Sequence, residues 1–237
     1  MCKKPIRYAE TIKVVYDRER WNLLKKLREK ALKIMKALEE QHIYAIVHGS
    51  IARGDVNKKS DIDIFIPNPP ASLIIETALE RANFKPTKRL IIQATPSYAI
   101  KAYIELDEQT SISFPLCKLR KIEREFYKFS GEIDLEKLKA GIRVPGVDKR
   151  LMLIEPTEYG HIESSIIGRE SEIAKILSLS LDIVLDRVRA LLRRDEIGRT
   201  GVFLKRELAP DEGFEAVLND LAKENPAVRR RLRLYGF

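Results

Sequence analysis

Two short apolar runs, at residues 44–47 and 62–66, constrain the fold more than any other part of the chain. The first run predicts a buried strand. Gly49 and Ser50 close this strand, and Ile51 begins a segment that can form a short helix. The free N–H groups at a helix N-terminus are a natural site for phosphate. The sequence therefore predicts a strand, a glycine turn and a helix N-terminus in direct succession.

Two alternating aspartates mark the second apolar run: Asp61 directly precedes it and Asp63 lies within it. Because side chains on a strand alternate between its faces, both carboxylates point to one face while Ile62 and Ile64 point into the core. Two carboxylates about 6.5–7 Å apart along one strand face can share a divalent cation. A phosphate cradle and a metal-binding carboxylate pair suit nucleotidyl transfer, because that reaction consists largely of positioning a triphosphate and neutralising its charge.

The two motifs together resemble the DNA polymerase beta-like nucleotidyltransferase superfamily, whose pattern is Gly-Ser, a nearby basic residue, and then Ser-Asp-hydrophobic-Asp. The resemblance spans roughly residues 40–116. It implies that a nucleoside monophosphate moves from a nucleoside triphosphate to a hydroxyl acceptor, with Mg²⁺ or Mn²⁺ as cofactor and pyrophosphate released. By this resemblance Asp61 and Asp63 are the metal ligands, and the nucleotide-binding residues are Gly49, Ser50, Arg53 and Ser60.

The same superfamily has a third carboxylate on a strand beside the Asp-x-Asp strand, and the sequence offers more than one residue for it. Glu105 is the first choice, because strand parity places it on the polar side while Ile104 takes the apolar side. Asp107 shares that parity and is the second choice. A different alignment places Ser111 at this position, and the catalytic base is then missing. The alternative function is accordingly a non-catalytic nucleic-acid-binding regulator with a degenerate nucleotidyltransferase domain.

The segments around these motifs predict an α/β domain over residues 1–155, with a mixed sheet flanked by helices. Asp17 can cap a long helix whose apolar residues recur at spacings of three and four. His48 is expected to be satisfied by the backbone, the alternative being a metal ligand. Phe126, Tyr127 and Phe129 are expected to pack in the interior, the alternative being that they stack on bases next to neighbouring cations. Further elements are expected as a helix at 71–82, strands at 89–94, 99–106 and 111–116, and a short helix from Asp134.

The last part of the chain, residues 156–237, is expected to form a second, mainly helical domain. Two apolar helical segments near residues 173–192, followed by a Gly-Arg-Thr-Gly stretch, resemble a winged helix-turn-helix at about 165–203. A packed helical pair that braces the first domain explains the same pattern. The cationic residues of this region are natural contacts for a phosphate backbone. They are Arg193, Arg194, Arg199, Arg229, Arg230 and Arg231.

Composition sets the remaining expectations. The chain has 237 residues, 44% hydrophobic and 33% charged, with a net charge of +9. Such basicity favours a polyanionic partner, RNA or DNA, and the many charged residues are a bias seen in proteins that work at high temperature. Cys2 and Cys117 form no disulfide framework. Without a signal peptide or a long apolar span, the expected location is the cytoplasm, with no membrane partner. The sequence does not set the oligomeric state.

Overall fold

The computed structural model describes residues 11–198 and 201–235. These residues form two compact units, each built from three stretches of chain. The first unit comprises residues 1–30, 47–60 and 124–200, and the second comprises residues 31–46, 61–123 and 201–237, in both cases as far as the structure describes them.

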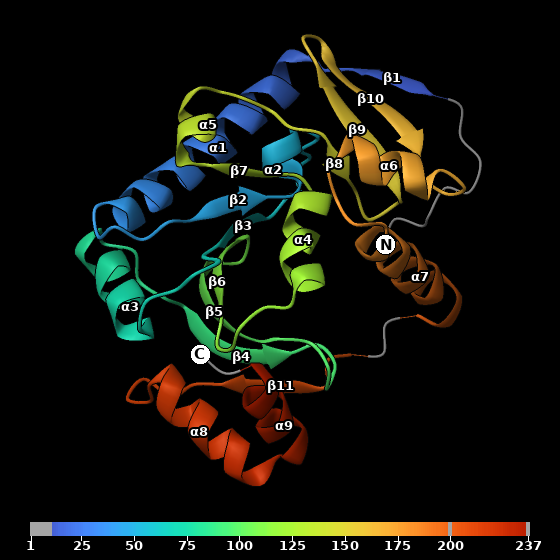
Figure 1. Ribbon diagram of the computed structural model, residues 1–237. Coiled ribbons are helices and arrows are strands. Elements are labelled where there is room, and N and C mark those ends of the chain that lie inside the picture. The colour runs from blue at the N-terminus through green and yellow to red at the C-terminus, as the bar shows by residue number, and fades with distance from the viewer. Residues whose placement is uncertain (1–10, 199–200, 236–237) are drawn as a thin grey trace. The chain divides into compact units, whose positions relative to one another are not determined.

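The first unit contains an antiparallel sheet in the order β1-β10-β9-β8 (Figure 1). Its strands are β1 (Ile12–Val15), β10 (Gly160–Ser165), β9 (Met152–Thr157) and β8 (Gly146–Val147). β1 pairs with β10, which lies far from it in the sequence, and Val14 is opposite His161. The helices α6 (Glu170–Ile176) and α7 (Leu181–Ile197) follow the sheet and pack on each other.

Several short elements complete the first unit, among them α2 (Ser50–Arg53), β7 (Glu132–Asp134) and α5 (Leu135–Lys139). Three others have residues in both units, namely α1 (Arg18–Glu39), β2 (Ile46–His48) and α4 (Lys121–Phe129). Asp17 caps α1 as expected, because its Oδ1 accepts a hydrogen bond from the Arg20 backbone N–H at 2.7 Å. Asp134 likewise caps α5 through the Lys137 N–H at 2.8 Å.

The second unit contains a mixed sheet with its strands in the order β11-β4-β5-β6-β3. Its strands are β3 (Ile62–Phe65), β4 (Lys88–Gln93), β5 (Ile100–Asp107), β6 (Thr110–Pro115) and β11 (Leu204–Glu207). β3 runs parallel to β6, whereas the pairs β11–β4, β4–β5 and β5–β6 are antiparallel. This mixed sheet confirms the expected fold class.

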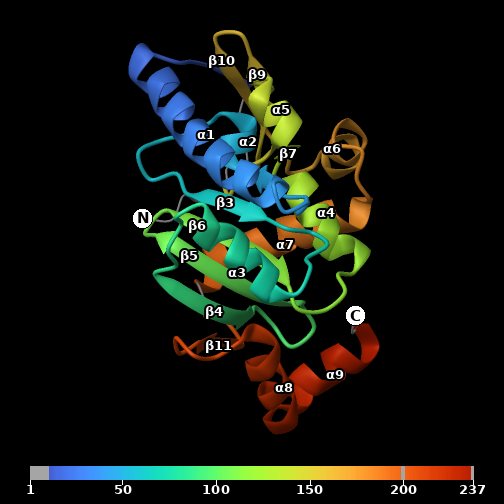
Figure 2. The same cartoon turned by 90° about the vertical axis from the view of Figure 1, so that its left-hand side faces the viewer.

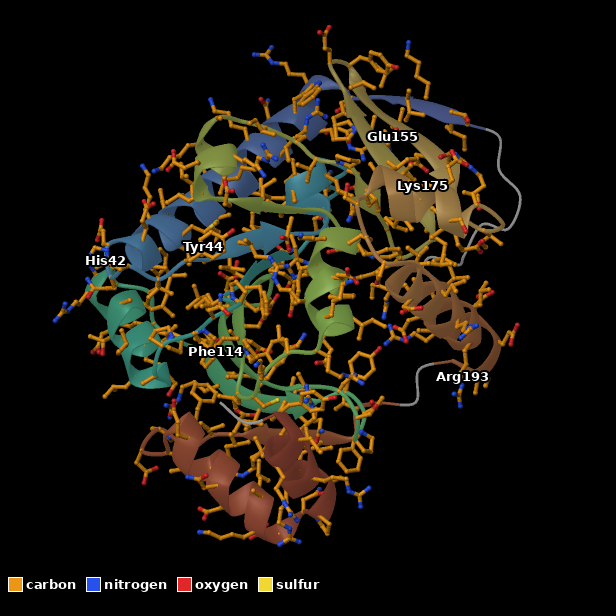
Figure 3. The ribbon with its side chains drawn as sticks, viewed as in Figure 1. His42, Tyr44, Phe114, Glu155, Lys175 and Arg193 are labelled. Carbon is orange, nitrogen blue, oxygen red and sulfur yellow. The ribbon has the colours of Figure 1, made fainter. Side chains whose placement is uncertain are left out.

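Helices flank this sheet, as the sequence predicts. α3 (Ser72–Arg81) faces the viewer in Figure 2, and α8 (Phe214–Glu224) and α9 (Pro226–Tyr235) lie beyond β11 in both views. The core holds Ile62, Ile64 and Ile112, all 0% exposed. Phe114 of β6, labelled in Figure 3, stacks edge-to-face on Phe214 of α8 with ring centroids 5.5 Å apart. The apolar face of the Asp-x-Asp strand is therefore buried as its alternation predicts.

The expected division of the chain at residues 155–156 falls inside a strand of the first unit. These residues lie inside β9, where Glu155 pairs with Ile162 and Pro156 with His161 of β10. The expected wing is not confirmed either: β11, which follows residues 199–200, pairs with β4 in the mixed sheet. Within the described residues, no helix combines the length and apolarity needed to cross a bilayer.

Candidate active site

The glycine turn after β2 has the backbone geometry expected of a phosphate cradle. Gly49 adopts φ 77° and ψ −142°, a region that residues with a side chain rarely enter. Nothing lies within 4 Å of the position that a Cβ would take on Gly49. The Gly49 N–H donates to the Gly131 carbonyl at 2.9 Å, and Ser50 begins α2 directly afterwards. The turn is therefore held from one side and open on the other.

His48 supports this turn from within the first unit. Its Nδ1 lies 3.1 Å from the Ser130 Oγ, and its ring packs edge-to-face on Tyr127 with centroids 4.9 Å apart. Tyr127 and Phe129 are each 2% exposed, so the aromatic segment packs in the interior as expected. His48 thus fixes the end of β2 by packing and hydrogen bonding.

Arg53 corrects the expectation that its guanidinium reaches a triphosphate. The residue is 5% exposed, and its NH1 donates to the Ser130 carbonyl at 2.5 Å. Its NH2 forms an ion pair with Asp55 Oδ2 at 2.9 Å. Both groups hold α2 against the segment that contains Ser130, and the guanidinium is engaged inside the protein.

Ser60 also differs from its expected role in nucleotide binding. It is 7% exposed, and its Oγ accepts from the Asn57 N–H at 2.9 Å, while its own N–H donates to the Asn57 carbonyl at 2.9 Å. These two bonds close the loop that precedes Asp61. Ser60 therefore shapes the chain before the Asp-x-Asp strand.

Asp63 lies in a row of polar residues that crosses the mixed sheet. Ser111 of β6 is the direct partner of Asp63 of β3 and of Glu105 of β5, so the three residues share one face. The Ser111 Oγ donates to Asp63 Oδ1 at 3.1 Å. Glu105 stands two strands from Asp63, about 9.5 Å away between backbones. Asp61 precedes β3 and is exposed.

Tyr103 is a neighbour of this row that sequence reasoning missed. It pairs with Ser113, which in turn pairs with Phe65, two residues beyond Asp63. Burial raises the pKa of Tyr103 to about 12, and the negative charge of Asp63 adds to the rise. The phenol therefore stays protonated at neutral pH and can donate a hydrogen bond. Its shared parity with Glu105 was the available signal.

The donor set suits a hard divalent cation only in part. Mg²⁺ is commonly bound by one or two carboxylates together with substrate phosphates and water, so Asp61 and Asp63 fit such an ion. Over the residues that the structure describes, no group of three carboxylate, imidazole or thiolate residues is placed to hold a metal. Ser111 occupies the strand position next to Asp63, which is the alternative left open by the sequence.

A comparison with protein families finds a match that includes part of this arrangement. Residues 28–128 match the nucleotidyltransferase domain. The nucleotidyltransferase domain thus covers the glycine turn, the Asp-x-Asp strand and β4 to β6. It supports nucleotidyl transfer as the general chemistry of the chain. A comparison with curated proteins finds no match.

The cationic residues expected to bind nucleic acid lie outside the nucleotidyltransferase domain. Arg193 (Figure 3) and Arg194 are exposed on α7 of the first unit, and Arg229 and Arg230 are exposed on α9 of the second. Arg199 lies outside the described residues. Arg231 corrects the expectation: it is 3% exposed, and its NH2 lies 2.8 Å from Glu123 Oε2. Because it is buried in an ion pair, Arg231 is not part of a surface patch.

Proposed function

We propose that this protein is a metal-dependent nucleotidyltransferase, which transfers a nucleoside monophosphate from a nucleoside triphosphate to a hydroxyl acceptor and releases pyrophosphate. The observation that carries the proposal is the row Asp63, Ser111 and Glu105 on one face of the sheet, inside a matched nucleotidyltransferase domain. A carboxylate pair at the start of β3 and a third carboxylate on β5 supply the groups that such a transfer requires.

Each residue has a distinct role in the proposed reaction. Asp61 and Asp63 hold Mg²⁺ or Mn²⁺, which when bound offsets the negative charge of the triphosphate. Ser111 orients Asp63 through its hydrogen bond of 3.1 Å. The Ser50 N–H and hydroxyl bind phosphate at the start of α2, and Gly49, whose own N–H donates to Gly131, leaves the approach to them open. Glu105 accepts the proton of the acceptor hydroxyl, which then attacks the α-phosphorus as the bond to pyrophosphate breaks.

The proposed acceptor is a nucleic-acid end. The net charge of +9 supports a polyanionic partner, and exposed arginines occur on both α7 and α9. The cationic side chains available for phosphate contacts on α9 are Arg229, Arg230 and Arg233, since Arg231 is buried.

Transfer of radiolabel from an α-labelled nucleoside triphosphate to RNA or DNA, together with pyrophosphate release, tests the activity. Glu105→Gln keeps the size and removes the charge, so turnover should fall by about 10²–10⁴-fold with little change in triphosphate affinity. Glu108→Gln, an exposed neighbour in the turn after β5, is the matched control and should retain full turnover.

A second variant separates the two candidate positions for the base. In the Glu105→Gln background, Ser111→Asp places a carboxylate directly beside Asp63 and should restore part of the turnover. Full activity of Glu105→Gln would contradict the assignment of Glu105, and Asp107 would be the next residue to change. If changing Glu105 and changing Asp107 both left turnover unaffected, the catalytic row would be refuted.

Metal-dependent binding of the triphosphate is a separate test. Replacing Asp61 and Asp63 by asparagine should abolish Mg²⁺-dependent affinity in calorimetry, while the fold persists because both carboxylates are polar groups at the surface end of β3. Undiminished metal-dependent affinity in the double variant would refute the metal site.

The hydroxyl of Ser111 beside Asp63 favours one second candidate, a nucleic-acid-binding regulator whose nucleotidyltransferase domain is degenerate. A regulator binds the triphosphate and nucleic acid but needs no base, so the absence of a carboxylate at position 111 is tolerated. Saturable triphosphate binding without pyrophosphate release on any acceptor would support it.

A further inference from the structure

In the second unit, segments that lie far apart in the sequence are joined in pairs by backbone hydrogen bonds. The Phe203 N–H donates to the Ala94 carbonyl at 3.1 Å, which ties the chain before β11 to the loop between β4 and β5. The Lys118 N–H donates to the Tyr235 carbonyl at 2.6 Å, which ties the chain before α4 to the end of α9.

Arg120 links the two pairs of segments. Its guanidinium lies 5.3 Å from the centroid of the Tyr98 ring, in the loop between β4 and β5. Gln93 holds that loop in place, because its Nε2 donates to the carbonyls of Pro96 and Tyr98 at 3.1 and 3.0 Å. A connected surface, called the cationic surface below, is therefore formed by residues 94–98, 118–121, 202–203 and 226–235.

The cationic surface carries charge of one sign. Its four segments contain seven lysines and arginines and no aspartate or glutamate, although the chain as a whole has 35 acidic residues. The nearby Glu123 is 4% exposed and is paired with Arg120 and Arg231, so it offsets the charges of those two residues. A face of one sign repels a second copy of itself and attracts a polyanion. The exposed cations are Lys118, Lys121, Arg229, Arg230 and Arg233.

Aromatic side chains lie among these cations. Phe203 is 42% exposed and Tyr235 is 37% exposed, while Tyr98 is half-buried. The Arg231 guanidinium lies 4.3 Å from the centroid of the Tyr235 ring, so a buried cation supports this ring as Arg120 supports Tyr98. Unpaired bases stack on aromatic rings, whereas the bases of a duplex are already stacked on one another. Exposed rings among cations are thus the combination that single strands require.

We infer that the cationic surface binds single-stranded nucleic acid. Bases stack on Phe203, Tyr98 and Tyr235, and the phosphates pair with the exposed lysines and arginines. The inference rests on the proposed function in one respect, because the bound strand is then the acceptor of the transferred nucleoside monophosphate. Binding of the strand itself requires neither the triphosphate nor the metal.

Fluorescence anisotropy with the full chain, without triphosphate or metal, tests the role of the aromatic residues. Labelled oligo(U) and oligo(dT) should bind more tightly than a duplex of the same length, and a preference between them identifies the strand as RNA or DNA. Phe203→Ala should weaken single-strand binding by about 5–100-fold, since one stacked base is worth about 1–3 kcal/mol. Tyr44→Ala, which removes an aromatic side chain that is 55% exposed elsewhere in the same unit, is the matched control and should bind as the wild type does.

The salt dependence of binding tests the role of the cations. Lys118→Gln with Lys121→Gln should flatten the log–log salt dependence of single-strand binding by about 1.4, because each phosphate contact contributes about 0.7. Phe203→Ala should leave this slope unchanged, since stacking releases no counterions.

Three results would overturn the inference. One is the absence of single-strand binding with about 100 µM protein at physiological salt, the weak end of ordinary non-specific binding. Another is equal single-strand affinity of Phe203→Ala and Tyr44→Ala. The third is a concentration-dependent dimer in sedimentation that Phe203→Ala dissociates, which would assign the surface to a second copy of the chain. Strand binding as described by a protein that releases no pyrophosphate would instead refute the proposed transfer and leave the inference standing.

Discussion

Replacing Arg231 by methionine should destabilise the protein by about 3 kcal/mol. Arg231 is 3% exposed and pairs with Glu123, which is 4% exposed. Removing one partner of a buried ion pair typically costs about 3–5 kcal/mol, because the other charge stays buried. Glu123 retains hydrogen bonds from the N–H groups of Ala99 and Arg120, each at 2.7 Å, and an ion pair with the Arg120 guanidinium at 3.1 Å, so the lower end of this range applies.

Urea unfolding followed by far-UV circular dichroism measures the effect. Tryptophan fluorescence alone is unsuitable, because the single tryptophan, Trp21, belongs to the other compact unit. Arg230→Met, the exposed neighbour on α9, is the matched control and should change the free energy of unfolding by less than about 0.5 kcal/mol. In a double-mutant cycle with Glu123→Gln, which removes the charge but keeps an oxygen acceptor for the N–H groups, the double variant should lose less stability than the sum of the two single variants.

The reasoning is refuted if Arg231→Met and Arg230→Met unfold at the same urea concentration with the same slope. A coupling energy near zero between Glu123 and Arg231 in the double-mutant cycle would refute it as well.

Three further outcomes are expected. Gly49→Ala should cost about 1–3 kcal/mol in urea unfolding through backbone strain alone, because φ 77° with ψ −142° is close to a region used almost only by glycine and no atom obstructs the new methyl group; an unchanged stability would contradict the strained turn. Glu163 has a folded pKa of about 2 against an ordinary 4.5, since hydrogen bonds and ion pairing outweigh the effect of burial. Its contribution is therefore fully present above pH 4.5 and is lost as the pH falls toward 2, so the stability gap to Glu163→Gln, up to about 2 kcal/mol after solvent screening, should close over that interval in urea titrations. If α9 contacts phosphates, Arg229→Gln with Arg230→Gln should flatten the log–log salt dependence of duplex binding by about 1.8, and an unchanged slope would remove α9 from the interface.

The elements and the polar row of the second unit were predictable from local patterns. Strand parity put Glu105 on the face opposite Ile104, and the register places it in line with Asp63. The expected strands β4 to β6 and the helix α3 agree with the observed bounds to within one residue. These features depend on alternation and periodicity within short segments, which a single sequence displays directly.

The partners of buried charges were not predictable in this way. Arg53 and Arg231 look like surface cations in sequence, and only the tertiary fold brings them against the Ser130 carbonyl and against Glu123. The strand pairing in the sheet of the first unit was missed for the same reason, because β1 pairs with a strand far away in the chain. Local pattern carries no information about such distant pairings.

The ion pair between Glu123 and Arg231 has a consequence for folding during synthesis on the ribosome. The two residues are 108 positions apart, and at about 5–20 residues per second the arginine is added about 5–20 s after its partner. Until then the carboxylate has only its neighbours Ala99 and Arg120. The second unit also lacks β11, α8 and α9 during this interval. Slow elongation over the last stretch of the message should therefore prolong the exposure of a nascent sheet edge at β4, the strand that β11 later covers.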